Sequence, residues 1–510
     1  MIVSVSSFDI PSPLPPRKIP ALQPEEFPNS PLPNQTTVPT PPLPTTTASP
    51  VVKKNVLKNY WPIGAIVVVL LLIFVVVSKF LLPNLKSPTA STITLNYWGL
   101  WEDSNIIDGL ISQYESQNPG IKINYIKNSK TDYRTRLAGR LNNAGSTSQD
   151  VPDIFRIHAT WLPMMKSYMA PVPTTVANDI KMDSDFFDVY KTDLKENGNY
   201  WAIPLMYDGL ALFYNKSILD SAGISPPKTW WGLRDSAKKL TVKDASGKIN
   251  IAGVAMGVTD NVDHWSDIVG TMLKQNGVDL FKGDDANKQK LQDVLTFYTL
   301  FRTSDQVWDE TLPNSTLDFA NGKLAYYFGP SWRIFDIDQI NPNLSYGVAP
   351  LPQLPTLSGV DPALIESGQA QGNLTNINWA TYWAEGVSNK SKYQKEAWKF
   401  LTFLASSDGL QKFYQSASQV RSFGELYPRK SMAASLSSNP KLKTFLDGAG
   451  TASSWYLSSR TFDSGVNDDM IGYFADAING IVQKNDQPGD VMTPLMNGIN
   501  QTIAKYHLTH

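Results

Sequence analysis

The stretch ITLNYWGLWEDSNIIDGLISQYESQNPGIKINYI, residues 93–126, decides the fold class. Its first five residues alternate apolar and polar side chains, as a half-buried strand does, and IKINYI at 121–126 alternates again. Between them, apolar residues recur at helical spacing until Asn-Pro-Gly at 118–120, a sequence that ends helices. Strand, helix and strand in about 35 residues form the βαβ unit of a largely parallel sheet. The sequence therefore predicts an α/β fold.

Later segments continue this alternation. The sequence PDIFRI at 152–157 predicts a short strand, and Thr229 is a favourable N-cap for a helix that runs to Leu240. Apolar residues between 397 and 404 recur on one face of a further helix. No repeat of about 20 to 50 residues is visible, which argues against a solenoid or a propeller.

Length and composition limit the function classes. At about 100–200 residues per domain, a chain of 510 residues predicts two or three folded units. Lys and Arg total 45 against 46 for Asp and Glu, so the chain lacks the basic excess of a nucleic-acid-binding protein. The absence of Cys excludes disulfides, thiolate metal sites, thiol nucleophiles and a Cys-linked lipid anchor. Only 4 His are present, and we expect neither a metal site nor a cofactor.

The N-terminal segment, residues 1–58, has a different composition from the rest. Its first 50 residues hold 14 of the 36 Pro, mixed with Ser and Thr. Such a segment buries too little apolar surface to offset the entropy of ordering its backbone, and we expect a disordered tail. The runs PSPLPP and TPPLP could dock on aromatic grooves of other proteins, but a flexible spacer is the favoured interpretation.

A single membrane-spanning helix is predicted at residues 59–82, where WPIGAIVVVLLLIFVVVSKFLL supplies the ~20 apolar residues that a bilayer core requires. Tyr60 and Trp61 suit the headgroup level at one end, and Lys79 is close enough to the other end to snorkel. Because about 60 residues precede the span, an uncleaved signal anchor fits better than a cleaved signal. The Lys distribution favours a cytoplasmic N-terminus by a narrow margin. Residues 83–91 form a linker to the soluble region.

Five sequence blocks in the soluble region resemble one family. Residues 200–240 read YWAIPLMYDGLALFYNKSILDSAGISPPKTWWGLRDSAKKL, and PDIFRIHATWLP precedes them. Three further blocks follow in order: FANGKLAYYFGPSWR at 319–333, LSYGVAPLPQLP at 344–355, and GVSNKSKYQKEAWKFLTFLASSDGLQKF at 386–413. Together they resemble the family 1 extracellular solute-binding proteins, the sugar-type receptors of bacterial ABC importers that include maltose-binding protein. The resemblance extends from about residue 92 to the C-terminus.

The resemblance implies a two-lobed α/β fold of the periplasmic-binding-protein type, with a hinge between the lobes and the ligand in the cleft. Lobe 1 would comprise residues 92–206 and 348–416, and lobe 2 residues 207–347 and 417–510 with the C-terminal helices. The implied partners are a sugar ligand and the permease subunits of the transporter, for a receptor that acts as a monomer on the extracellular face. Family members are lipid-anchored through a Cys or secreted after cleavage, and this chain departs from both patterns.

Sugar recognition needs flat aromatic faces for the apolar side of the ring and planar polar groups for its hydroxyls. Eight residues at expected cleft positions are the ligand-binding candidates: Trp98, Glu102, Trp161, Asp208, Trp265, Trp332, Trp379 and Arg421. By resemblance, Asp208 matches a hinge position that often contacts ligand, and its alternative is a turn Asp bound by local amides. Trp332 matches a position that commonly stacks on sugar, and its alternative is a buried core Trp.

Enzyme signatures are absent from the sequence. It contains no complete P-loop, no Gly-x-Ser-x-Gly elbow and no His-Glu-x-x-His. A glycoside hydrolase remains open, because it needs only two suitably placed carboxylates. A membrane-tethered sensor on the same fold is the other alternative. We expect a receptor that is not an enzyme and that binds an uncharged oligosaccharide rather than a peptide, polyamine or oxyanion.

Overall fold

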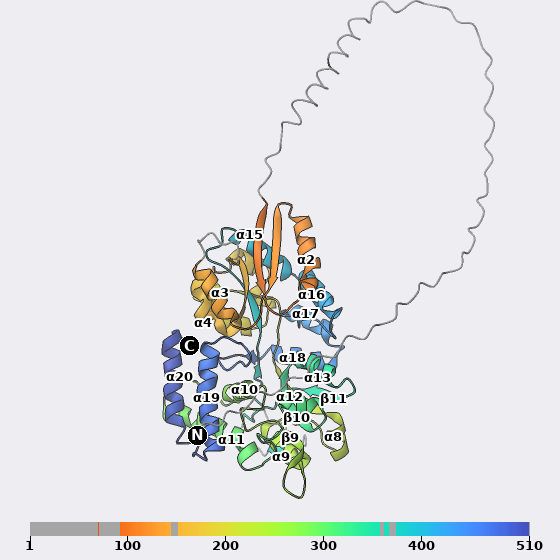
Figure 1. Cartoon of the computed structure of the whole chain (residues 1–510), viewed down its shortest axis with the longest axis vertical. Helices are drawn as coiled ribbons and strands as arrows, with labels where there is room; N and C mark the ends of the chain where they lie inside the picture. The colour runs from red at the N-terminus through yellow and green to blue at the C-terminus, as the bar shows by residue number, and fades with distance from the viewer. Residues whose placement is uncertain (1–69, 71–91, 144–150, 357–361, 367–373, 509–510) are drawn as a thin grey trace, which may run out of the picture. The chain divides into compact units, whose positions relative to one another are not determined.

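The computed structural model describes residues 70, 92–143, 151–356, 362–366 and 374–508. Every element below belongs to the compact unit Pro88–His510 (Figure 1). The predicted tail (1–58), nearly all of the predicted span (59–82) and the linker (83–91) lie outside the described residues. Within the described part, no helix combines the length and the apolar character that crossing a bilayer requires.

The first sheet has five strands in the order β2-β1-β3-β13-β6. Their bounds are β1 Ile93–Gly99, β2 Ile121–Lys127, β3 Ile154–His158, β6 Ile203–Pro204 and β13 Trp383–Val387. β1 runs parallel to both β2 and β3, whereas β13 is antiparallel to β3 and β6. The helix between β1 and β2 is α2 (Ser104–Gln117), so the predicted βαβ unit and the α/β class are confirmed.

The second sheet also has five strands, in the order β11-β7-β10-β9-β8. Their bounds are β7 Leu210–Asn215, β8 Val242–Lys243, β9 Ile249–Val254, β10 Leu324–Pro330 and β11 Tyr346–Ala349. β7 lies antiparallel to β10 and β11, and β10 runs parallel to β9. Two short pairs complete the strands: β4 (Lys195–Glu196) with β5 (Asn199–Tyr200), and β12 (Asn378–Trp379) with β14 (Ala452–Ser453).

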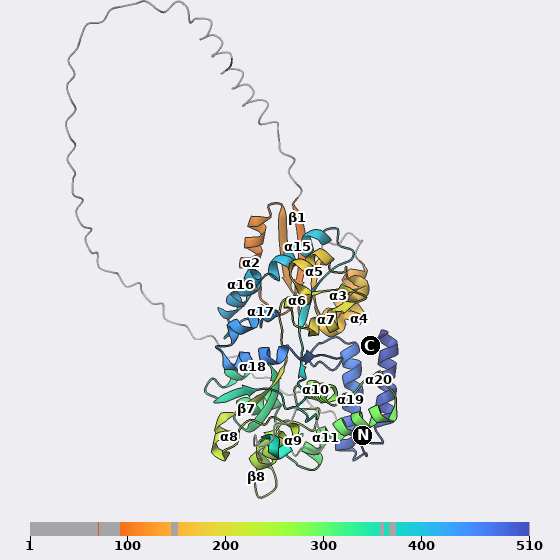
Figure 2. The same ribbon diagram turned by 180° about the vertical axis from the view of Figure 1, so that it is seen from behind.

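Helices surround each sheet (Figures 1 and 2). Around the first sheet lie α2, α3 (Tyr133–Asn142), α4 (Leu162–Met165), α5 (Thr174–Asp179), α6 (Met182–Asp185), α7 (Val189–Leu194), α15 (Gln394–Leu404), α16 (Ser407–Ser418) and α17 (Lys430–Ala433), with the short turns η2 (Ala159–Trp161) and η3 (Lys166–Tyr168). Around the second lie α8 (Lys216–Ala222), α9 (Trp230–Leu240), α10 (Trp265–Gln275), α11 (Asp285–Thr303), α12 (Ser315–Ala320), α13 (Arg333–Ile340), α14 (Pro362–Glu366) and α18 (Pro440–Ala449), after η4 (Ala434–Leu436). The chain ends in the helix pair α19 (Val466–Gln483) and α20 (Met492–Tyr506).

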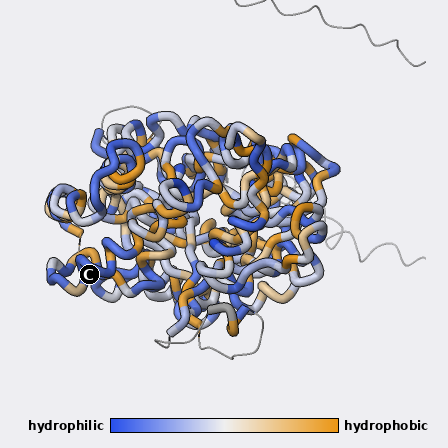
Figure 3. The backbone as a smooth tube through the Cα atoms, turned by 90° about the horizontal axis from the view of Figure 1, so that it is seen from below, coloured by the Kyte–Doolittle hydropathy of each residue, from blue (hydrophilic) through white to orange (hydrophobic). Residues whose placement is uncertain are grey.

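Local sequence explains where several of these helices begin and which face they bury. The Thr229 side chain accepts a hydrogen bond from the Gly232 amide, so the predicted N-cap of α9 is confirmed. The buried residues of α2 and α15 recur at the spacing seen in the sequence. Hydrophobic and hydrophilic residues alternate over short distances along the described chain (Figure 3). This alternation is expected where each helix buries one face and exposes the other.

The chain passes between the two sheets more than once, and the passages contact one another. The first follows β6 and leads into β7, and a later one leads from β11 back to β13. Gly209 of the first passage bridges to Ala380, and Tyr207 bridges to Leu426. The Thr381 amide also donates to the Asp208 carbonyl at 3.0 Å. These backbone contacts tie the passages into one connection between the sheets.

Candidate functional site

Aromatic rings gather where strands of the first sheet end. The carboxyl ends of the parallel strands β1 and β3 meet at one edge of the sheet, which is the usual place for a ligand in such folds. Trp101 follows β1, and Trp383 opens the antiparallel β13 opposite His158. The ring centre of Trp383 lies 5.4 Å from that of Trp101 and 5.2 Å from that of Trp161. With Phe462, whose ring centre is 6.4 Å from that of Trp101, these three Trp form the aromatic cluster.

The segment that carries Phe462, residues 459–467, contacts elements that follow strands of both sheets. At one end, Ser459 donates to Asp267 of α10 through its amide (3.1 Å) and its hydroxyl (2.5 Å). At the other end, Asn467 Nδ2 donates to Thr160 Oγ1 of η2 at 2.6 Å. We call residues 459–467 the connecting segment. It fixes the aromatic cluster of the first sheet beside the loops of the second.

The backbone of the connecting segment is strained. Arg460, Phe462 and Ser464 all lie in the left-handed region, with φ values of 58°, 54° and 45°. Each such residue other than Gly costs of order 1 kcal/mol and persists only where its surroundings hold it. Strained residues of this kind cluster at ligand sites. The segment is therefore a candidate wall of a binding site rather than a plain linker.

Charged and aromatic side chains of the second sheet face this segment. The Asp263 carboxylate pairs with both Arg460 and Arg333, the latter at 3.2 Å. Burial opposes ionisation of Asp263, but the two guanidinium groups and nearby donors hold its pKa well below the ordinary value. The Arg333 guanidinium also lies 4.4 Å from the ring centre of Trp332. Arg333 therefore orients a half-buried Trp through a cation–π contact.

His264 belongs to the same group of second-sheet side chains as Asp263, Arg333 and Trp332, which we call the second-sheet wall. Arg333 Nε donates to His264 Nε2 at 2.9 Å, so Nε2 is an acceptor and the imidazole is neutral. Its Nδ1 lies 3.1 Å from Asp267 Oδ2 and 2.9 Å from Ser459 Oγ. Burial lowers the pKa of His264, which agrees with this neutral form. The imidazole ring centre is 5.7 Å from that of Trp332.

Asp208 occupies the first passage between the sheets. Its carboxylate accepts hydrogen bonds from the Ser331 amide (2.9 Å), the Ser331 hydroxyl (2.9 Å) and the Gly209 amide (2.7 Å). Burial raises the pKa of Asp208 to about 7 although these donors favour the charged form. The hydrogen bonds of the Asp208 carboxylate thus link the first passage to Ser331, which precedes Trp332 and α13.

The structure buries five of the eight predicted ligand residues. Their exposed fractions are 6% for Trp98, 2% for Glu102, 0% for Trp161, 9% for Trp265 and 0% for Trp379. Trp161 belongs to the aromatic cluster, where it packs edge-on against Trp383. Trp379 donates through Nε1 to Asp267 at 2.8 Å and packs against Gly270. Trp161 thus packs within the aromatic cluster, and Trp379 shares the Asp267 carboxylate with Ser459 of the connecting segment.

Glu102 is engaged in a buried ion-pair network. Its carboxylate pairs with Arg156, which also pairs with Glu385 at 2.6 Å, and all three side chains are at most 2% exposed. Burial raises the pKa of Glu385, and the guanidinium of Arg156 opposes that rise. Because Glu102 directly follows Trp101, the network anchors the loop that presents the Trp101 ring.

The three remaining predicted residues are partly accessible. Trp332 and Asp208 lie beside the second-sheet wall described above. Arg421 lies apart from it: its guanidinium pairs with Glu425 and covers the Phe335 ring at 5.1 Å. The structure thus brings Trp332 and Asp208 together through Ser331, and it gives Arg421 a different set of partners.

Some residues of the site have little signal in the sequence. Trp101 is recognisable by its place after the first strand, although a Trp at this position could instead pack against the helix that follows. Trp383, Arg460 and Phe462 join the site only through strand pairing and a left-handed backbone, which residues other than Gly rarely adopt. Among the described residues, no cluster of His, Cys, Asp and Glu could hold a metal ion.

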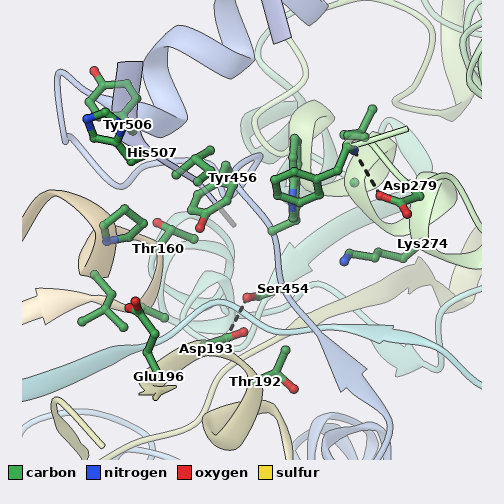
Figure 4. Close-up of a pocket in the computed structure, with 18 of the residues that line it drawn as sticks. Thr160, Thr192, Asp193, Glu196, Lys274, Asp279, Ser454, Tyr456, Tyr506 and His507 are labelled. Carbon is green, nitrogen blue, oxygen red and sulfur yellow. Dashed lines mark hydrogen bonds between the residues drawn. The ribbon is translucent and has the colours of Figure 1, made fainter. Parts of the chain in front are cut away.

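A separate cavity of about 670 Å³ lies between loops that follow the two sheets (Figure 4). Thr160 and Asp193 line it from the first-sheet side, Lys274 lines it from α10, and Ser454 and Tyr456 close it. Asp193 accepts a hydrogen bond from Ser454 Oγ at 2.7 Å. Burial raises the pKa of Asp193 to about 6. The eight residues predicted from sequence do not belong to the described lining of this cavity.

Comparison with known proteins identifies the family. Residues 99–411 match the family model described as bacterial extracellular solute-binding protein. The chain belongs to this family. The multiple sugar-binding protein of Streptococcus mutans serotype c is 22% identical over 335 residues, which cover 63% of this chain and 73% of that protein. The sn-glycerol-3-phosphate-binding periplasmic protein UgpB of Escherichia coli K12 is 26% identical over 341 residues, which cover 63% and 72%.

Solved structures of solute-binding proteins share the fold. A cyclo/maltodextrin-binding protein in complex with maltotetraose aligns with a TM-score of 0.62 at 18% identity, covering 82% of this chain and 99% of that one. The substrate-binding protein Lmo0181 of Listeria monocytogenes in complex with cycloalternan aligns with a TM-score of 0.58 at 19% identity, covering 81% and 100%. The expected family and its mixed α/β fold, which matches that of two-lobed solute-binding proteins, are confirmed.

Proposed function

We propose that this protein is the solute-binding receptor of an ABC import system and that it binds a sugar or oligosaccharide between its two lobes. One observation carries the proposal beyond family membership: aromatic rings of the first sheet and the Trp332 wall of the second meet at one strained segment, beyond the carboxyl ends of β1 and β3. Relatives in this family include a multiple sugar-binding protein, which supports a sugar as the solute class.

The proposed lobe boundaries follow the passages between the sheets. Lobe 1 comprises residues 92–206 and 348–416, and lobe 2 comprises residues 207–347 and 417–510. Strand membership supports the first boundary, because β6 is the last strand of the first sheet before the chain enters β7, and β13 later returns to the first sheet. The second boundary, at 347/348, falls inside β11 of the second sheet. The backbone bridges among the passages then act as the hinge about which the lobes close.

Each part of the site has a proposed role in sugar binding. The faces of Trp332, Trp101 and Trp383 stack on the apolar faces of sugar rings, and Arg460 donates hydrogen bonds to hydroxyl oxygens. The buried candidates Trp98, Trp161, Trp265 and Trp379 hold these rings and loops in place. A sugar that contacts both lobes stabilises the closed form, which is the form expected to dock on the permease.

The remaining part of the proposal concerns attachment. The apolar segment at 59–82 anchors the receptor as a signal anchor, with the proline-rich tail inside the cell and the binding unit on the extracellular face. Its sequence, long enough and apolar enough to cross a bilayer, supports this placement. A monomeric receptor tethered in this way meets its permease at a raised effective concentration without new contacts.

A thermal-shift screen tests the proposed function. The full chain in detergent is heated with mono- and oligosaccharides, and a ligand at 100 times its Kd adds ~2.7 kcal/mol to stability. We expect a saccharide to raise the melting temperature and Trp332→Ala to reduce its affinity about 10-fold, because stacking contributes ~0.5–1.5 kcal/mol beyond the effect of the area that the ring buries.

The chain offers a matched control for this substitution. Trp231 on α9 is 38% exposed, and its ring packs only on Phe297 among the described aromatic side chains, away from the connecting segment. Trp231→Ala should leave saccharide binding unchanged. If amino acids or peptides shift the melting temperature and no saccharide does, the solute class is refuted; if a glycoside is cleaved on incubation, the protein is an enzyme instead.

A further inference from the structure

The 670 Å³ cavity carries an inference of its own, because it is lined by both lobes and is separate from the proposed sugar site. Segments 159–167 and 192–196 form its first-lobe side, and segment 270–281 forms its second-lobe side. Residues 454–456 and the end of α20 close it. Its volume falls within the ~300–1,000 Å³ of typical ligand pockets.

Most charged groups of the cavity already have partners. Lys166 pairs with Glu196 at 2.5 Å, and Lys195 pairs with Asp183 at 2.9 Å. Asp193 accepts hydrogen bonds from the hydroxyls of Ser454 and Tyr382, at 2.7 and 2.8 Å. These carboxylates therefore need no cation from a ligand.

Lys274 is the exception. Figure 4 shows its side chain extending into the cavity toward Ser454 and Asp193. In the described part of the chain, its ammonium group makes neither an ion pair nor a hydrogen bond, and Asp193 and Asp279 act on it only at longer range. Burial lowers the pKa of Lys274. The Lys274 ammonium group thus offers unused N–H donors to the cavity. A ligand group that carries negative charge and accepts hydrogen bonds would complement it.

The rest of the lining suits an apolar, flat ligand body. Trp455 and Tyr456 pack edge-on with ring centres 5.3 Å apart, and Phe281 and Leu280 line the second-lobe side. Aromatic rings of this kind bury the face of a ring-shaped ligand. A ligand complementary to the cavity therefore joins a ring to an anionic group.

We propose that this cavity is a second ligand site, which binds a small ring-bearing organic anion, a carboxylate or a phosphate, through Lys274. The anionic oxygens pair with the Lys274 ammonium group, and the ring packs on Trp455 and Tyr456. Because the lining comes from both lobes, the bound anion holds the lobes in their present arrangement. This site is independent of the proposed sugar site, so each of the two proposals can be refuted without affecting the other.

Titration calorimetry on the full chain in detergent tests the site with three probes of similar shape. Benzoate and phenyl phosphate carry the anion, and benzamide is the neutral match of benzoate. We expect benzoate or phenyl phosphate to bind at least about 10-fold more tightly than benzamide. Lys274→Met should weaken anion binding about 10- to 100-fold, whereas Lys274→Arg should retain most of it.

Two further measurements keep the outcomes distinct. Unchanged melting of Lys274→Met shows that the variant is folded. If it is not folded, the comparison of benzoate with benzamide on the unsubstituted chain carries the test. Trp332→Ala should leave anion binding intact, because Trp332 does not line the cavity. Equal affinities for benzoate and benzamide, loss of anion binding in Trp332→Ala but not in Lys274→Met, or no anion binding at up to about 10 mM would each overturn the proposal.

Discussion

Replacing Asp208 with Asn should make the stability of this protein less dependent on pH. Burial raises the pKa of Asp208 from its ordinary value of 3.8 to about 7 in the folded protein. The folded state therefore holds this proton more tightly than the unfolded state does. This contribution to stability is fully present below pH 3.8 and is lost as the pH rises to about 7.

The size of the effect follows from the two ionisation constants. Each tenfold difference is worth about 1.4 kcal/mol, so the rise in the pKa of Asp208 corresponds to about 4 kcal/mol at most. An Asn side chain keeps a carbonyl oxygen to accept from the Ser331 and Gly209 amides but does not titrate. The wild-type protein should thus lose stability relative to Asp208→Asn by about 2–4 kcal/mol between pH 4 and pH 8.

Urea unfolding of both proteins at intervals from pH 4 to pH 8 measures this difference. Ser331→Ala is the matched variant, since it removes a hydroxyl donor that favours the charged carboxylate and should move the titration of Asp208 to higher pH. A difference in unfolding free energy between wild type and Asp208→Asn that stays constant within about 1 kcal/mol over this range would refute the reasoning.

Two other substitutions test the support of the site. Arg156→Met should destabilise the protein by about 3–5 kcal/mol in urea unfolding, because it leaves the buried carboxylates of Glu102 and Glu385 without their cation; adding Glu102→Gln and Glu385→Gln should restore most of the loss, and no recovery would contradict the ion-pair explanation. Gly270→Ala should lower the melting temperature by an amount equivalent to about 1–3 kcal/mol, since a Cβ there would lie 2.4 Å from the Trp379 ring; an unchanged melting temperature would show that this contact is not tight.

Much of the local structure could be read from the sequence because its causes are local. The alternation at 93–126 gives β1, α2 and β2, and the Thr229 hydroxyl caps α9 as expected. The five motif blocks indicated the family, which the match over residues 99–411 confirms. The assignment of the lobes and of the eight ligand residues stays a prediction.

The binding site depended on contacts between residues distant in the chain. The sequence placed Glu102 in a loop after a strand, and only the packing of β3 and β13 beside it supplies Arg156 and Glu385 as partners. A ring that follows a strand looks the same in sequence whether it is exposed or covered, since its burial depends on neighbours from other segments. Trp161, which follows β3 and has no exposed surface, is such a case.

Periodicity and capping fix helices, strands and family motifs here, because those interactions join residues a few positions apart. Antiparallel pairing of β13 with β3 brings Trp383 to Trp101, and a left-handed backbone turns Phe462 toward them. Neither follows from the residues alone, because strand pairing and backbone strain are settled by the packing of the whole fold. The sequence thus determined the framework, and the tertiary structure decided which side chains meet at the site.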